Sequence, residues 1–268
     1  MDNKSLYEAY KTKMQKIADV KYASAVLQWD QETYLPPKGN ETRGRQIATL
    51  SEIAHNLFTD EKLGQLLLEL LGKDGLSMNE KRNVELTFED YTKNKKLPVA
   101  FVRKMSETVN KSFYAWIQSR KENSFAVFRE PLDEVINLKK QEADYIGFEK
   151  HPYNALMNDY DKGLTVDTVD ALFSALRPQL ISLTEEIAGR TAVDNSFLQG
   201  HFEKAKQWEF GIEILKRMHF DFEAGRQDIS EHPFTINFNS TDVRVTTRID
   251  EKDFANMTWS CLHEGGHA

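Results

Sequence analysis

The sequence predicts a mainly α-helical protein that carries a small β element close to its C-terminal end. Apolar residues recur at three- and four-residue spacing over most of the 268 residues, as on the buried face of a helix. A period of two, typical of half-buried strands, is confined to residues 234–249. Helical spacing returns over residues 253–267. We expect a single mostly helical region over residues 1–268, within which residues 232–268 hold the strands and the start of a last helix.

Long helices are expected throughout the part of the chain that precedes the strands. Their ranges are 5–31, 40–71, 79–95, 98–120, 124–146, 166–190 and 199–218. Pro36 and Pro37 separate the first two ranges, because proline cannot continue a helix. Thr59 and Asp60 are both good N-cap residues, which leaves open that the second range is two helices.

Two groups of residues in this helical part could bind a ligand, but a structural explanation is preferred for both. Four aromatic side chains are expected to be core residues rather than ligand-stacking ones: Phe113, Trp116, Phe125 and Phe128. His151, Asp159 and Asp161 lie in the loop-like segment 147–163, and their spacing matches no metal-ligand pattern. We expect these three side chains to be solvated.

Two strands are expected ahead of the last helix. Residues 234–239 and 243–249 alternate apolar and polar side chains and are rich in β-branched residues, with a hairpin turn at 239–242. Asp250 or Asp253 is expected to cap the helix that follows. An edge strand beside that helix could hold an extended peptide by β-augmentation.

The last helix ends in the sequence His263-Glu264-Gly265-Gly266-His267, which is a zinc-hydrolase signature. Residues i and i+4 share one helix face, so His263 and His267 can present two imidazoles to one metal ion. Glu264 is then placed to accept a proton from water that zinc acidifies during peptide hydrolysis. The alternative is a helix end with two solvated histidines.

Other residues of this helix have less specific interpretations. Cys261 is expected to face away from the histidines and to be buried in packing rather than bound to metal. Gly265 and Gly266 each cost a helix about 1 kcal/mol relative to alanine. Close approach of a substrate or a neighbouring helix would explain them, and fraying at a helix end is the alternative.

Composition excludes several function classes. The net charge of −7, with basic residues scattered among acidic ones, argues against nucleic acid as the main partner. A single cysteine fits a reducing compartment. The first 16 residues lack the apolar stretch of a secretory signal, and no apolar run approaches the length of a membrane span. A cytoplasmic location is therefore expected.

Three segments together resemble the M32 metallocarboxypeptidases of the thermostable carboxypeptidase 1 type. They are His232-Pro233-Phe234, Asp242-Val243-Arg244-Val245-Thr246 (a DxRxT pattern) and the HEGGH segment at 263–267. The stretch WDQETYLPPKG at 29–39 also looks like the opening region of that family. The resemblance spans nearly the whole chain, which looks like the first half of a family member. It implies a long-helix, deep-cleft, zincin-like peptidase fold related to other long-cleft helical peptidases.

The resemblance also implies an activity and a set of roles. The expected enzyme is a homodimer that removes single residues from peptide C-termini with broad specificity. It would use zinc, for which cobalt or manganese could substitute. His263 and His267 would be metal ligands and Glu264 the general base, with a glutamate farther along the chain as third ligand. His232, Arg244 and Asp242 are candidate substrate contacts. Alternatively, His232 fixes the turn before Phe234, and Arg244 pairs with Asp242 or another carboxylate.

Catalytic zinc sites keep three protein ligands, and only two are visible here. We therefore expect the chain by itself to be inactive or nearly so. An oligopeptidase of similar helical fold and a non-catalytic helical interaction module that retains HEGGH are the alternatives to a carboxypeptidase.

Overall fold

The computed structural model describes residues 2–268, which form two compact units. Unit 1 comprises residues up to Leu27 together with Lys38–Gln179, and unit 2 comprises Gln28–Pro37 together with Leu180–Ala268. The helices that lie wholly or partly in unit 1 are α1 (Asn3–Thr33), α2 (Asn40–Phe58), α3 (Glu61–Leu71), α4 (Met78–Asn94), α5 (Val99–Glu122), α6 (Ala126–Ile146), α7 (Tyr153–Met157) and α8 (Val166–Ala188), with a short 3-10 turn at Pro37–Gly39. The ends of α1 and α8 extend into unit 2.

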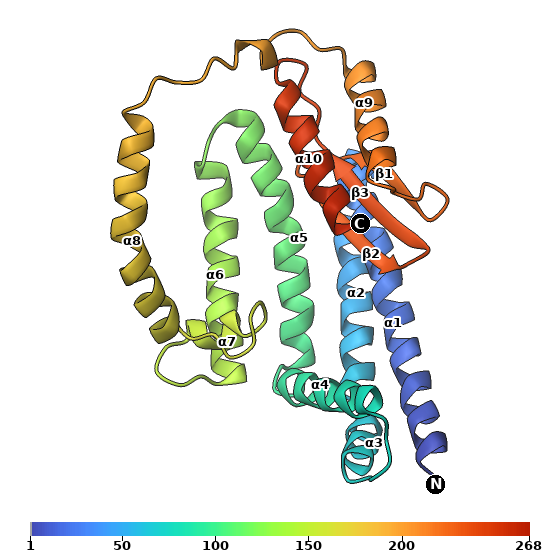
Figure 1. The fold of residues 1–268 in the computed structure, drawn as a ribbon. Helices are drawn as coiled ribbons and strands as arrows, with labels where there is room; N and C mark the ends of the chain where they lie inside the picture. The colour runs from blue at the N-terminus through green and yellow to red at the C-terminus, as the bar shows by residue number, and fades with distance from the viewer. Residues whose placement is uncertain (1) are drawn as a thin grey trace. The chain divides into compact units, whose positions relative to one another are not determined.

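The core of unit 1 confirms the predicted helical spacing. Leu6, Tyr10 and Ile17 of α1 pack with apolar residues of α3 and α4, and α2, α5 and α6 lie side by side (Figure 1). The possible interruption at Thr59 and Asp60 is real, because the Asp60 carboxylate accepts a hydrogen bond from the backbone N–H of Lys62 at 3.2 Å and caps α3.

The prediction that four aromatic residues are core was wrong for Phe125. Phe125 is 61% exposed, and the other three are only half-buried. Phe125 contacts Phe128, and Phe113 contacts Trp116, with ring centroids 6.5 and 5.9 Å apart. Helical spacing identifies an apolar face, but it does not say whether another element covers that face.

The loop-like segment 147–163 contains the short helix α7, which is too short to give a periodic signal. His151, Asp159 and Asp161 are exposed, as predicted. Asp159 pairs with Lys93, and the His151 imidazole accepts a hydrogen bond from the backbone N–H of Tyr153 at 3.1 Å. These contacts give the segment a structural role.

Unit 2 is built on a three-stranded sheet of order β1-β3-β2 (Figure 1). Its elements are a 3-10 turn (Ser196–Leu198), α9 (Lys204–Arg217), β1 (Gly225–Ile229), β2 (Thr235–Asn239), β3 (Asp242–Thr247) and α10 (Phe254–His267). The predicted hairpin is present as antiparallel β2 and β3. The sequence did not predict β1, which pairs with β3 in parallel, because its buried residues Gln227 and Asp228 are polar.

None of the helices formed by residues 2–268 combines the length and the apolar character that a membrane span requires.

Candidate metal centre

Helix α10 is fixed at its start by Asp253, one of the two predicted caps. The Asp253 carboxylate accepts hydrogen bonds from the backbone N–H groups of Ala255 and Asn256 at 3.0 and 3.3 Å. One face of α10 packs on α9 and β3, with Met257 and Cys261 buried. Cys261 is a buried packing residue, as predicted, and its burial raises the pKa of its thiol.

The two glycines of the HEGGH segment have different surroundings. A Cβ on Gly265 would lie 2.7 Å from Cδ2 of Leu215 on α9, so this glycine permits the close approach of two helices. A Cβ on Gly266 would meet no atom within 4 Å. The neighbouring helix therefore explains Gly265 but not Gly266.

We expect alanine at these two positions to have opposite effects on stability. Gly266→Ala should raise the free energy of unfolding by up to about 1 kcal/mol through helix propensity. Gly265→Ala should lower it by about 1–3 kcal/mol, because Leu215 is fully buried and has little room to move. Urea unfolding of the two variants measures both changes. Equal stabilisation by both would contradict the close approach of α9.

His263 and His267 lie one above the other on the exposed face of α10. Their Nε2 atoms are 3.3 Å apart, and the ring centroids are 4.8 Å apart with nearly perpendicular planes. Both side chains are solvent-accessible. Two nitrogen ligands of a tetrahedral zinc ion, each about 2.0–2.1 Å from the metal, are separated by about 3.3–3.4 Å. The histidine pair thus has the spacing that one metal ion requires.

Glu264 is buried, and strand β2 holds its carboxylate. The Thr235 hydroxyl lies 2.6 Å from Oε2 of Glu264 and 3.1 Å from the Glu264 carbonyl oxygen, so it can donate to either. Farther along β2, the Asn237 side-chain amide donates to the carbonyl of His267 at 3.1 Å. A helix end leaves its last carbonyls unpaired, and the Asn237 amide satisfies that of His267 here. The sequence did not indicate this contact, because Thr235 and Glu264 are 29 positions apart.

An open depression of about 620 Å³ lies beside the histidine pair. It is lined by His232, Pro233, Trp259, Ser260, Leu262, His263 and Glu264. His232 therefore shares a cavity with His263 and Glu264. Its Nδ1 also lies 2.7 Å from the carbonyl oxygen of Pro233, which is the turn-fixing contact considered above.

Arg244 and Asp242 do not line this depression. The Arg244 guanidinium donates to the Asp242 carboxylate at 3.0 and 3.1 Å. It also lies over the rings of Trp29 and Phe238, 4.4 and 5.2 Å from their centroids. The ion pair with Asp242 corresponds to the second interpretation of Arg244 given above.

A second arginine completes a cluster around Trp29 that sequence reasoning missed. The Arg226 guanidinium lies 5.0 Å from the Trp29 ring centroid and donates two hydrogen bonds of 2.7 Å to Asp228, whose side chain is only 2% exposed. The Tyr34 hydroxyl also donates to Asp228. This cluster fastens the segment Gln28–Pro37 to the sheet of unit 2. The WDQETYLPPKG resemblance was the only sequence signal for it.

Glu32, in the same segment, is half-buried and interacts electrostatically with His232. Burial raises the pKa of its carboxyl from 4.5 to about 7, and His232 acts weakly in the opposite direction. A carboxyl whose pKa is raised on folding contributes its full stability below its unfolded pKa of 4.5 and loses it as the pH rises through about 7.

We therefore expect Glu32→Gln to raise the free energy of unfolding at pH 8 by about 1–2 kcal/mol, reduced from the full effect because the group is half-exposed. At pH 5 the variant should differ little from the unmodified chain. Urea unfolding at both pH values measures this, with Glu209→Gln on the exposed face of α9 as control. The idea fails if the two variants respond to pH alike.

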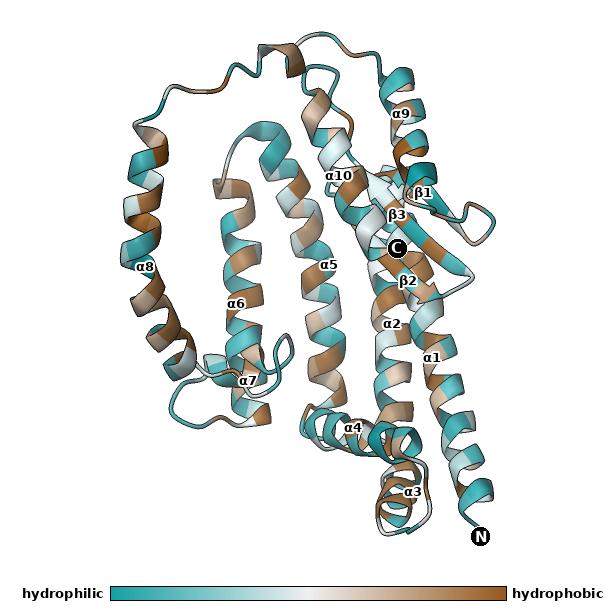
Figure 2. Ribbon diagram, viewed as in Figure 1, coloured by the Kyte–Doolittle hydropathy of each residue, from teal (hydrophilic) through white to brown (hydrophobic). Residues whose placement is uncertain are grey.

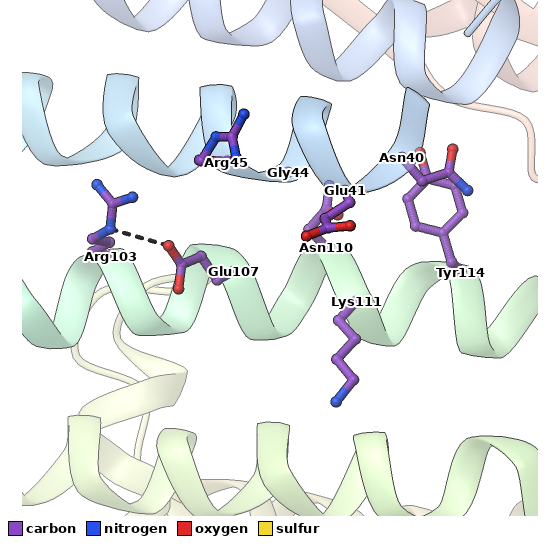
Figure 3. A pocket seen from close by; sticks show the side chains of 9 residues that line it. All are labelled: Asn40, Glu41, Gly44, Arg45, Arg103, Glu107, Asn110, Lys111 and Tyr114. Carbon is purple, nitrogen blue, oxygen red and sulfur yellow. Dashed lines mark ion pairs between the residues drawn. The ribbon is translucent and has the colours of Figure 1, made fainter. Parts of the chain in front are cut away.

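A separate groove of about 480 Å³ lies between α2 and α5 in unit 1 (Figure 3). It is lined by Asn40, Glu41, Gly44, Arg45, Arg103, Glu107, Asn110, Lys111 and Tyr114. Arg103 pairs with Glu107 at 3.0 Å and with Glu52 at 2.8 Å. The groove therefore carries charges of both signs, some of them paired.

Comparison with known proteins places this geometry in a family. Residues 9–268 match the family described as carboxypeptidase Taq (M32) metallopeptidase. The chain is 35% identical over 257 residues to carboxypeptidase 1 of Bacillus subtilis. This match covers 95% of this chain and 51% of that protein. It is 30% identical over 259 residues to thermostable carboxypeptidase 1 of Pyrococcus furiosus, covering 96% of this chain and 52% of that protein.

Solved structures agree with these matches. "BsuCP Crystal Structure" superposes with a TM-score of 0.95 at 33% identity, and "The Structure of CHT" with 0.85 at 54% identity; both cover 98% of this chain and 54% of the other. The chain thus spans about half the length of the relatives that it matches. With a match that runs from residue 9 to residue 268, the chain belongs to the M32 family of metallopeptidases.

Proposed function

We propose that this chain carries two metal ligands and the general base of a zinc-dependent carboxypeptidase that releases C-terminal amino acids from peptides with broad specificity. His263 and His267 are the ligands, and Glu264 is the base. The observation that carries the proposal is the 3.3 Å separation of the two Nε2 atoms, in a chain that belongs to a metallopeptidase family. Cobalt or manganese could substitute for zinc.

The roles of the chain's own residues follow from their positions. A bound zinc ion supplies Lewis-acid polarisation of a carbonyl group and lowers the pKa of water. Glu264 would take the proton of the attacking water, since this residue lines the depression and Thr235 keeps its carboxylate in place. His232 would contact the end of the peptide from the wall of the same depression.

Strand β2 could hold an extended peptide substrate beside α10. It is an edge strand of the sheet and lies against α10, so its outer edge could pair with a substrate backbone. Arg244 and Asp242 are proposed to act indirectly, because Arg244 lies over the Trp29 ring and its ion pair with Asp242 keeps it there.

A third ligand is proposed to come from outside this sequence. No group of three or more His, Cys, Asp or Glu side chains within residues 2–268 could hold a metal ion. By the resemblance, the missing ligand is a glutamate. The chain alone should then bind metal weakly and be inactive or nearly so. By the same resemblance, the whole enzyme is proposed to be a homodimer, and the single cysteine of this chain fits a cytoplasmic location.

The test compares the chain alone with a completed chain, which is extended past Ala268 by the part of the 54% identical relative that lies outside the match. The completed chain should hydrolyse a peptide with a free C-terminal carboxylate, and the chain alone should not. Hydrolysis by the chain alone that is lost in Glu264→Gln would contradict the proposal.

A peptide blocked at both ends separates the two peptidase classes. A carboxypeptidase needs the free carboxylate and should leave this peptide intact, whereas an oligopeptidase should cleave it. Cleavage of the blocked peptide at a comparable rate would favour the oligopeptidase. Absence of metal and of hydrolysis in a folded completed chain would favour the non-catalytic interaction module.

A further inference from the structure

Helix α8 is exposed over almost its whole length. It contains no buried residue, and every residue from 171 to 188 is exposed. Large apolar residues nevertheless recur along it at three- and four-residue spacing, with exposed fractions between 40% and 61%. We name these residues the α8 stripe: Leu172, Phe173, Leu176, Leu180, Leu183 and Ile187.

The α8 stripe has the pattern of a buried helix face. At 3.6 residues per turn its members fall within a sector of about 100°. Ser174 and Ser182 lie on the opposite side, and brown residues alternate with teal ones along α8 in Figure 2. A continuous apolar stripe of this size is uncommon on a surface that faces only water, and an isolated helix is marginally stable without packing. The pattern therefore calls for a covering partner.

Pro178 indicates which side of α8 remains in water. Proline has no backbone N–H, so the carbonyl of Ser174, four residues earlier, lacks its intrahelical donor. Pro178 and Ser174 both lie opposite the α8 stripe, where water can satisfy that carbonyl. Apart from Ile181, which lies about 80° beyond the edge of this sector, the helix thus has one side suited to solvent and one suited to a protein core.

The lengths of the relatives indicate what covers the stripe. The two solved structures cited above cover 98% of this chain, and α8 has 23 residues, so nearly all of α8 lies inside the superposed part. The same superpositions account for only 54% of each relative. In the relatives, the helix that corresponds to α8 belongs to a longer polypeptide. The part of that polypeptide outside the superposition is almost as long as the superposed part.

We propose that the α8 stripe is a docking surface for the part of an M32 polypeptide that lies outside the matched half. The α8 stripe includes neither the proposed metal ligands nor Glu264, so docking on it does not depend on the proposed activity. A second copy of this chain is the competing occupant, and the experiment distinguishes the two.

The experiment co-expresses this chain with the part of the 54% identical relative that lies outside the match, and it compares two double variants. Leu176→Glu with Leu183→Glu places two charges on the stripe. Ser174→Glu with Ser182→Glu places the same charges on the opposite side. All four positions are exposed in the chain alone, so both variants should keep the far-UV circular dichroism of the unmodified chain.

The unmodified chain and the serine variant should co-purify with the partner polypeptide as a one-to-one complex. Light scattering measures the mass of that complex. Amide hydrogen exchange over residues 171–188 should slow at least about tenfold in that complex. The leucine variant should bind more than about tenfold more weakly. Equal binding by both variants, or unchanged exchange in α8, would overturn the proposal. So would self-association of the chain that the leucine variant abolishes while the partner polypeptide fails to bind.

Discussion

Glu264→Gln in the completed chain is expected to lower kcat by about 100- to 10,000-fold, the range that general acid–base catalysis contributes. Glutamine has nearly the shape of glutamate, and its side-chain oxygen can still accept the hydrogen bond from the Thr235 hydroxyl. What it loses is the ability to take a proton. The position of α10 and the histidine pair should therefore be unchanged, and the variant should retain one metal ion per chain.

Steady-state kinetics together with metal analysis measures this effect, and Thr235 supplies the matched controls. Thr235→Ser keeps a hydroxyl and should retain most of the activity. Thr235→Val removes the donor that fixes Glu264 and should lower kcat more than it changes KM. If Glu264→Gln kept more than about a tenth of the activity with its metal intact, Glu264 would not be the base.

Arg226→Ala is expected to have the largest effect on stability, lowering the free energy of unfolding by about 2–3 kcal/mol, which is less than for a fully buried ion pair because the Arg226 side chain is 51% exposed. The substitution removes both 2.7 Å hydrogen bonds to Asp228 and leaves a carboxylate that is almost fully buried with only Tyr34 as donor. It also removes the guanidinium from the face of Trp29. An unpaired buried charge is costly because the protein interior solvates it poorly.

Urea unfolding of the whole chain measures this effect. Arg217→Ala is the control, because Arg217 pairs with Glu213 at 2.8 Å on the exposed side of α9 and should contribute little. Arg226→Lys keeps a charge but not the two-point contact, and it should fall between the two. A loss below about 1 kcal/mol in Arg226→Ala would mean that the Trp29 cluster does not hold unit 2 together.

The parts that sequence predicted well are those whose signal is local. The long helices follow from apolar spacing, and the histidine pair follows from a separation of four residues on one helix. The break at Asp60 was visible because capping depends on neighbouring residues. Each of these features is determined within a few turns of chain.

The parts that sequence missed depend on contacts between distant segments. Strand β1 has buried polar residues, so no apolar alternation marks it. Trp29 and Arg226 are nearly 200 positions apart, and nothing in either segment alone indicates that they meet. Phe125 was wrongly predicted to be buried, because the spacing of apolar residues along a helix is the same whether or not another element covers that face. The α8 stripe is a second instance of an apolar face left exposed.

Metal content after dialysis tests the central claim most directly, namely that this chain holds two of three zinc ligands. Plasma mass spectrometry should find one zinc per molecule in the completed chain and far less in the chain alone, because two histidines bind zinc weakly. The His267→Ala variant of the completed chain should lose its zinc. Stoichiometric zinc in the chain alone would contradict the account, because a third residue among these 268 would then complete the site.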